Sequence, residues 1–178
     1  MKLYLSSYRL GNNPRGLANI AGENKKVAVI ANAMDFLADK TSRDESVQME
    51  VDDLKKLGFY AEEVDLRKYF GRQNELNDVL QKYGTFWVRG GNVFILRRAF
   101  KESGMDEWLR SQKVNKGLVY GGYSAGVCVL SPSLKGLELV DNPNNIPAGY
   151  KKEADWEGVG LIGYSFAPHY MSNHPESE

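Results

Sequence analysis

Between residues 118 and 130 the chain reads LVYGGYSAGVCVL. An apolar run leads into two glycines, Ser124 stands at the centre of the motif G-x-S-x-G, and a second apolar run follows. This pattern predicts a buried strand, a sharp turn at Ser124 and then a helix. Gly122, Ala125 and Gly126 supply the small neighbours that such a turn requires, because the backbones of the strand and the helix nearly touch there.

The same alternation of short apolar runs and longer helical segments extends along the chain. We predict strands at residues 2–6, 27–31, 60–65, 86–89, 118–121 and 161–167. Apolar residues at helical spacing predict helices at residues 43–57, 73–83 and 93–101, and turn-forming residues predict loops at 11–22 and 141–149. Strands that are apolar throughout and joined by helices indicate an α/β fold, with a doubly wound, mostly parallel sheet and helices on both faces.

The composition narrows the classes of function. A chain of 178 residues suits one domain with a hydrophobic core. Lys plus Arg and Asp plus Glu both number 23, so no net charge favours binding to nucleic acid or to an anionic membrane. The apolar stretch at the N-terminus is shorter than the core of a signal peptide, and no run of about 18 apolar residues occurs. We therefore expect a cytoplasmic protein with no nucleic-acid or membrane partner.

The scarcity of cysteine and histidine argues against a metal centre. The single cysteine, Cys128, excludes an intrachain disulfide and any multi-cysteine metal site. With two histidines, His169 and His174, a zinc site would need carboxylates at unusual spacing. We expect no metal, and we interpret Cys128 as a small buried hydrophobic residue in the helix after Ser124.

Ser124 needs a base, since a serine hydroxyl is a weak nucleophile at neutral pH. In doubly wound sheets, ligands bind at the carboxyl ends of the strands. His169 follows the predicted strand at residues 161–167 and would share this edge with Ser124, whereas His174 lies in a polar tail and is expected in solvent. We predict Ser124 as nucleophile and His169 as general base. The alternative is a glycine-rich turn with an incidental serine.

A second glycine-rich loop, RGGN at residues 89–92, follows the predicted strand at residues 86–89. Its backbone N–H groups, together with that of Ala125, are candidates for an oxyanion hole, although a glycine pair at a helix start is as often only a turn. Arg89 has two interpretations. Its guanidinium binds a substrate carboxylate, or it is a surface arginine paired with a nearby acid.

Three motifs occur in order: RGGNVF at residues 89–94, GYSAG at 122–126 and APHY at 167–170. Together they resemble the peptidase E family of serine peptidases, and the resemblance covers nearly the whole chain. It implies a fold like that of class I glutamine amidotransferases, which is flavodoxin-like, with serine in place of their cysteine. It also implies no cofactor and the hydrolysis of small peptides through an acyl-enzyme. The best known members cleave dipeptides with N-terminal aspartate.

The resemblance assigns roles to seven residues of this chain. They are the nucleophile Ser124, the base His169, the oxyanion donors Gly91 and Ala125, the triad acid Asp141, and the substrate-binding residues Asn92 and Arg89. Asp141 matches the family's downstream acid only approximately, and it stands beside Asn142 and Pro143, where aspartate is also a routine turn former. Arg89 departs from the small residue that family members often carry.

The chain ends at Glu178, soon after His169, whereas family members usually continue through another helix and strands that include a second candidate acid. We therefore expect one hydrolase domain over residues 1–178 that lacks the family's C-terminal segment. The competing hypothesis is a non-catalytic or scaffold protein with an incomplete site. An ordinary α/β-hydrolase esterase is disfavoured, because its histidine lies later than this chain has room for. A homodimer is left open.

Overall fold

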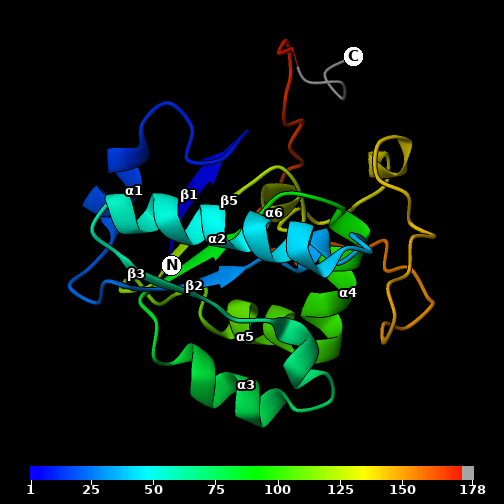
Figure 1. Ribbon diagram of the computed structural model, residues 1–178, viewed down its shortest axis with the longest axis horizontal. Helices are drawn as coiled ribbons and strands as arrows, with labels where there is room; N and C mark the ends of the chain where they lie inside the picture. The colour runs from blue at the N-terminus through cyan, green and yellow to red at the C-terminus, as the bar shows by residue number, and fades with distance from the viewer. Residues whose placement is uncertain (174–178) are drawn as a thin grey trace.

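The centre of the computed structural model, which describes residues 1–173, is a parallel sheet of five strands in the order β1-β5-β4-β2-β3 (Figure 1). The strands are β1 (Lys2–Ser6), β2 (Lys26–Ile30), β3 (Tyr60–Glu63), β4 (Thr85–Val88) and β5 (Val119–Tyr123). Each lies within two residues of a strand that the sequence predicts. From β2 the chain continues to its neighbour β3 on one side of the sheet, and from β4 it continues to its neighbour β5 on the other side. The predicted α/β, doubly wound fold is confirmed.

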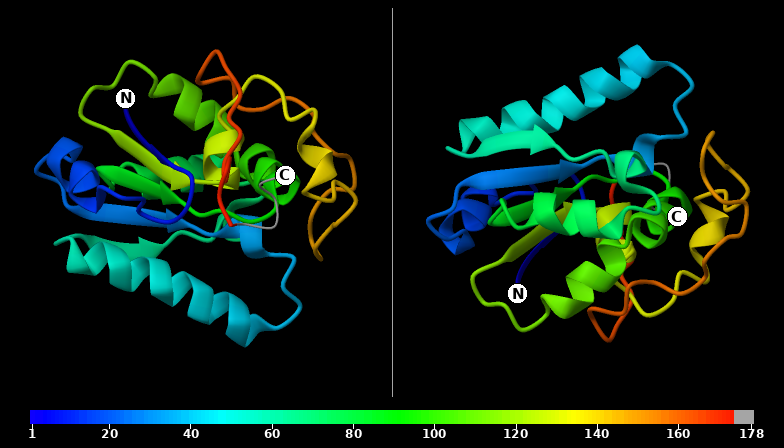
Figure 2. Two further views of the ribbon diagram at one scale, coloured as in Figure 1. Left: turned by 90° about the horizontal axis from the view of Figure 1, so that it is seen from above. Right: turned by 90° about the horizontal axis from the view of Figure 1, so that it is seen from below.

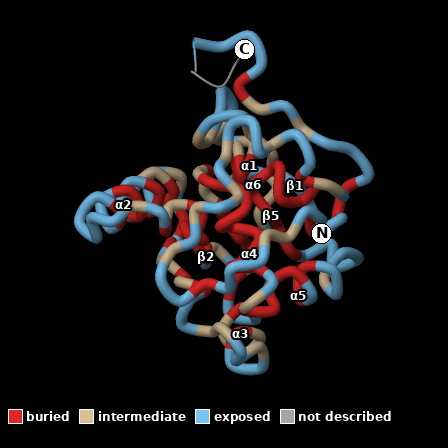
Figure 3. Tube along the Cα trace, turned by 90° about the vertical axis from the view of Figure 1, so that its right-hand side faces the viewer, coloured by how far each residue is buried: buried red, intermediate tan, exposed pale blue. Residues whose placement is uncertain are grey.

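Helices cover both faces of the sheet (Figure 2). One face carries α1 (Pro14–Ile20) and α2 (Lys40–Lys56), and the other carries α3 (Gln73–Leu80), α4 (Val93–Ser103) and α5 (Met105–Ser111). Four shorter helices lie in the connections: α6 (Ala125–Cys128), η1 (Asn32–Met34), η2 (Leu66–Tyr69) and η3 (Leu137–Leu139). The helices α2, α3 and α4 match predictions, whereas α5 was not predicted from the sequence. Buried segments gather between these layers, as Figure 3 shows.

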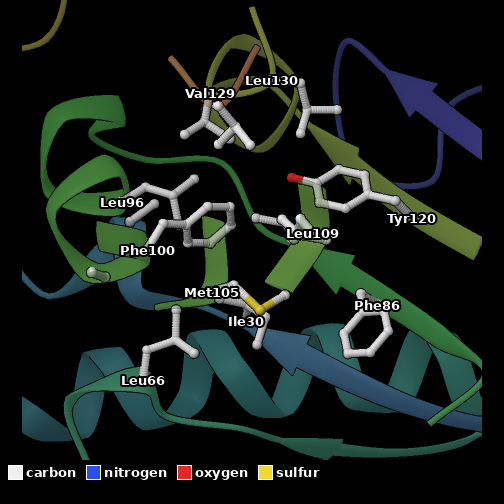
Figure 4. Packing of buried hydrophobic residues seen from close by; sticks show 14 of the residues in the cluster. Ile30, Leu66, Phe86, Leu96, Phe100, Met105, Leu109, Tyr120, Val129 and Leu130 are labelled. Carbon is white, nitrogen blue, oxygen red and sulfur yellow. The ribbon is translucent and has the colours of Figure 1, made fainter. Parts of the chain in front are cut away.

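The strands are buried on both faces because their side chains alternate between two cores. In β4, Phe86 and Val88 pack with residues of α3, α4 and α5, while Trp87 packs with residues of α1 and α2 on the other face. Figure 4 shows the first of these cores, to which Phe86 of β4 and Tyr120 of β5 contribute from the sheet and Phe100 contributes from α4. Burial of each such large side chain contributes about 1.5–3 kcal/mol. This gain explains why continuous apolar runs in the sequence form strands.

The strand predicted at residues 161–167 is wrong, because this segment is irregular. Leu161 and Ile162 are buried beyond the end of α6, where their backbone N–H groups donate to the carbonyl of Leu130 at 3.0 and 3.4 Å. After Gly163 the chain leaves the core, and Tyr164 is 60% exposed. The apolar run therefore packs onto a helix and its following turn instead of joining the sheet.

The loop predicted at residues 11–22 is also wrong, because it contains α1. Pro14 stands in the first turn of this helix, where its missing N–H removes no hydrogen bond, and Leu17 is fully buried. Gly16 weakens the helical signal in the sequence, since glycine disfavours helix interiors. The other predicted loop, at residues 141–149, is confirmed.

The turn after β5 brings the backbone of α6 against the end of β4. A Cβ atom on Gly126 would lie 2.2 Å from the carbonyl oxygen of Val88. This distance is shorter than any real contact, so only glycine allows α6 to begin where it does.

We predict that Gly126→Ala lowers the free energy of unfolding by about 3 kcal/mol, because the added methyl group overpacks a rigid backbone contact. Urea denaturation measures the change. The control is Gly163→Ala, where an added Cβ has nothing within 4 Å. Equal unfolding midpoints for the wild type and Gly126→Ala would show that the contact with Val88 does not constrain the fold.

Candidate active site

A cavity of about 410 Å³ lies at the carboxyl ends of the parallel strands. It is lined by the loops that follow β1, β2, β4 and β5, and by the irregular segment after η3. Six of the seven site residues predicted from the sequence line this cavity: Arg89, Gly91, Asn92, Ser124, Asp141 and His169. The seventh, Ala125, follows Ser124 directly and is buried. The carboxyl edge of the sheet is where ligands bind in doubly wound folds.

Ser124 occupies the sharp turn between β5 and α6. Its backbone has φ 49° and ψ −118°, a left-handed conformation that is strained for a residue with a side chain. The backbone carbonyl of Ser124 accepts hydrogen bonds from the N–H groups of Val127 and Cys128 at 2.8 and 3.0 Å. The turn thus fixes the serine at the start of α6 while its side chain lines the cavity.

His169 faces Ser124 directly. Its Nε2 lies 3.2 Å from the Ser124 Oγ, and the residue is 5% exposed. His169 does not follow a strand as predicted, and its backbone has φ 65°. Its place comes instead from the loop after β1, where the His169 N–H donates to the Ser7 Oγ at 2.7 Å and the Tyr8 ring meets the imidazole edge-on. The other candidate, His174, lies outside the described residues.

The loop at residues 89–92 packs tightly beside the serine. A Cβ on Gly91, which has φ 141°, would lie 2.5 Å from the carbonyl oxygen of Ala33, so this position requires glycine. A Cβ on Gly90 would lie 2.9 Å from the Cβ of Ser124. Within residues 1–173, the N–H groups of Gly91 and Ala125 have no hydrogen-bond acceptor in the protein. Both amides are therefore available to a ligand near Ser124.

Asn92 and Asp141 join this loop to the irregular segment after η3. The Asn92 Oδ1 caps α4 by accepting the N–H groups of Phe94 and Ile95, and its Nδ2 donates to the Asn142 carbonyl at 3.1 Å. The Asp141 Oδ2 accepts the Val93 N–H at 2.8 Å. Both polar ends of the Asn92 side chain are thus engaged by the chain itself. Asp141 is bonded to the first residue of α4 and lines the same cavity as Ser124 and His169. Its role as triad acid stays a prediction.

Arg89 lies close to an acid, as the ion-pair interpretation expects, but its side chain is 14% exposed and so does not lie on the open surface. Its Nε lies 3.4 Å from the Oε1 of Glu50, and its Nη1 donates to the Gly90 carbonyl at 3.0 Å. Sequence reasoning missed Glu50, although a signal existed. Glu50 interrupts the apolar stripe of α2 formed by Val47, Val51 and Leu54, where a charge is unexpected.

No helix between residues 1 and 173 is long and apolar enough to cross a bilayer. In the same residues, no three His, Cys, Asp or Glu side chains gather in a group that could hold a metal ion.

Comparison with known proteins gives consistent matches. The sequence profile described as "Peptidase family S51" matches residues 13–178. An uncharacterized peptidase of Listeria monocytogenes, Lmo0363, is 29% identical over 125 residues, which cover 70% of this chain and 57% of that protein. The "Peptidase E" of Haemophilus influenzae is 27% identical over 101 residues, with 57% and 42% covered. The "Probable alpha-aspartyl dipeptidase" of Drosophila melanogaster is 29% identical over 92 residues, with 52% and 35% covered.

Solved structures share the fold. A structure described as a "Putative Peptidase E Protein from Listeria monocytogenes EGD-e" superposes with a TM-score of 0.78 at 25% identity, covering 97% of this chain and 81% of that one. A peptidase from an acI-B1 Actinobacterium superposes with a TM-score of 0.61 at 16% identity, covering 94% and 68%. The chain spans about half the length of the curated relatives that it matches.

We predict that Asn92→Ala lowers the free energy of unfolding by about 1–2 kcal/mol, because it removes the N-cap of α4. It should also speed amide hydrogen exchange in residues 141–145, since the bond to the Asn142 carbonyl is lost. Denaturation and exchange measured by mass spectrometry test both effects. A matched control is Asn13→Ala, since Asn13 stands at the N-cap of α1 without a capping bond from its side chain. An unchanged exchange rate at residues 141–145 would contradict the proposed link.

Proposed function

Because the chain belongs to peptidase family S51, we propose that it is a serine peptidase that hydrolyses small peptides, with Ser124 as nucleophile and His169 as base. The observation that carries this proposal is the 3.2 Å separation of the Ser124 Oγ and the His169 Nε2 inside one cavity. The left-handed backbone of Ser124 supports it, because strained turns at a strand-to-helix junction present nucleophiles in hydrolases. We propose that this turn is a nucleophile elbow.

The proposed reaction has two steps. The Ser124 Oγ attacks the peptide carbonyl while its proton passes to the His169 Nε2, and the tetrahedral oxyanion accepts hydrogen bonds from the N–H groups of Gly91 and Ala125. Collapse of this intermediate breaks the C–N bond, and the imidazolium returns the proton to the leaving amine. Water then attacks the acyl-enzyme with the same base, which releases the acid and restores the serine.

Asp141 is proposed as the residue that stabilises the imidazolium. It lines the same cavity as Ser124 and His169, which supports an electrostatic role. The alternative is that another carboxylate serves as the triad acid.

The proposed substrate is a dipeptide, with N-terminal aspartate as the preferred residue. A cavity of about 410 Å³ suits a ligand of that size. The names of the matched relatives, which include an alpha-aspartyl dipeptidase and a peptidase E, support this class of substrate.

We predict that wild-type protein is labelled at Ser124 by a fluorophosphonate and that Ser124→Ala abolishes both labelling and hydrolysis. The variant should keep its unfolding midpoint, because the serine hydroxyl acts in the transition state and not in core packing. Ser165→Ala, at an exposed serine, is the control and should label like the wild type. A wild-type chain that neither labels nor hydrolyses a panel of dipeptides would favour the non-catalytic scaffold.

We predict that Asp141→Asn lowers turnover by about 10⁴-fold, as loss of the orienting acid does in other triads. The asparagine oxygen still accepts the Val93 N–H, so the change removes the charge with little effect on the loop. Rates of dipeptide hydrolysis measure the loss, and Asp78→Asn on the exposed face of α3 is the control. Equal, robust activity in wild type and Asp141→Asn would remove Asp141 from the triad.

A further inference from the structure

Glu50 is a buried carboxylate beneath the candidate active site. It lies on the sheet-facing side of α2 and is 2% exposed. Both of its oxygens are bonded: the Tyr123 OH donates to Oε1 at 2.6 Å, and the Trp87 Nε1 donates to Oε2 at 2.8 Å. Transfer of a carboxylate out of water costs several kcal/mol even after relaxation. An apolar residue at this position of α2 would avoid that cost, so packing alone does not explain the glutamate.

The partners of Glu50 belong to the two segments that form the site. Tyr123 directly precedes Ser124, and Trp87 and Arg89 lie in and after β4, just before Gly90 and Gly91. Burial, with the charge of Glu50 as the next cause, raises the pKa of Tyr123, so its hydroxyl remains a donor. One carboxylate therefore holds the serine turn and the glycine loop at the same time.

Arg89 extends this contact to the backbone of the glycine loop. Its Nε lies 3.4 Å from the Glu50 Oε1, and its Nη1 donates to the Gly90 carbonyl at 3.0 Å. The Gly90 carbonyl and the Gly91 N–H belong to one planar peptide unit, which is trans, so they point in opposite directions. A bond that fixes the Gly90 carbonyl therefore fixes the direction of the Gly91 N–H.

We propose that Glu50 and Arg89 form a positioning pair that sets the orientation of the Gly91 N–H relative to Ser124. The inference rests on the proposed function, in which this amide binds the oxyanion. Glycine at both positions gives this peptide unit backbone conformations that residues with a Cβ rarely adopt, so its orientation needs a specific contact. The bond from Arg89 to the Gly90 carbonyl supplies that contact, and the ion pair with Glu50 holds Arg89 in place. Arg89 then serves the reaction through the backbone, with its Nη1 bonded to the Gly90 carbonyl and its Nε within ion-pair distance of Glu50.

The test uses two variants, each of which removes a different property of the pair. Glu50→Gln keeps the shape of the side chain but removes the charge that holds Arg89, and Arg89→Lys keeps a charge but loses the planar fork that reaches both partners. Each should lower kcat and the rate of fluorophosphonate labelling by about tenfold to a hundredfold, with KM changed by less than about threefold, because the oxyanion forms only in the transition state. The double variant should be no slower than the slower single variant, since the two residues act as one unit.

Amide hydrogen exchange supplies a readout that does not need activity. Both variants should exchange faster at residues 89–92 and 123–126, and Asp52→Asn on the exposed side of α2 should leave both segments unchanged. Wild-type rates of labelling and exchange in Glu50→Gln and Arg89→Lys would overturn the inference. A wild-type protein that is not labelled would overturn the proposed function, while the exchange data would still decide whether Glu50 orders the two segments. If Glu50→Gln fails to fold, Arg89→Lys alone gives the result.

Discussion

The close contact between Gly126 and the Val88 carbonyl constrains the turn that carries Ser124 at the carboxyl edge of the sheet. It brings the start of α6 against the end of β4, so the turn between β5 and α6 has no room to relax. Ser124 takes a left-handed backbone as a consequence, and its Oγ is held beside the glycine loop that follows β4. The strain at Ser124 persists because the buried strands on both sides determine the path of the chain.

Buried charged side chains hold the loops in place by hydrogen bonds, whereas apolar side chains hold the helices against the sheet. The segment from residue 141 to residue 157 contains no helix and no strand, yet its first residues, Asp141, Asn142 and Asn145, line the cavity. Arg98 on α4, 2% exposed, donates to the carbonyls of Pro143, Lys152 and Glu153 and so holds this segment at several points. Carbonyl groups of an irregular segment need such donors, because an unpaired buried backbone group costs about as much as a lost hydrogen bond. Glu50 has the same role beneath Ser124, with side-chain donors as its partners.

The sequence predicts the parts of the fold that depend on local pattern. The strands and α2, α3 and α4 follow from apolar periodicity, and the turn at Ser124 follows from the small residues around it. The strand expected at residues 161–167 fails because periodicity reports that Leu161 and Ile162 are buried but not what they pack against. Likewise, the motif around His169 predicts that the histidine lies near Ser124, but its anchor Ser7 is 162 positions away in the chain. Contacts of that separation leave no local trace in a single sequence.

The two halves of the candidate site therefore differ in how firmly they are held. Ser124 and the glycine loop belong to the strands and share their core, whereas His169 is carried by an irregular segment. As far as Ile162, backbone hydrogen bonds attach that segment to α6 and the turn after it, with the N–H groups of Val159, Leu161 and Ile162 as donors. Residues 163–168 are exposed or half-buried, and beyond them the Ser7 Oγ accepts the His169 N–H. Segments with few buried contacts open at a lower free energy than the sheet does. The distance between the His169 Nε2 and the Ser124 Oγ thus depends on the segment that carries His169 and on its bond to Ser7. A change in the loop after β1 would therefore alter the site while the sheet stays folded.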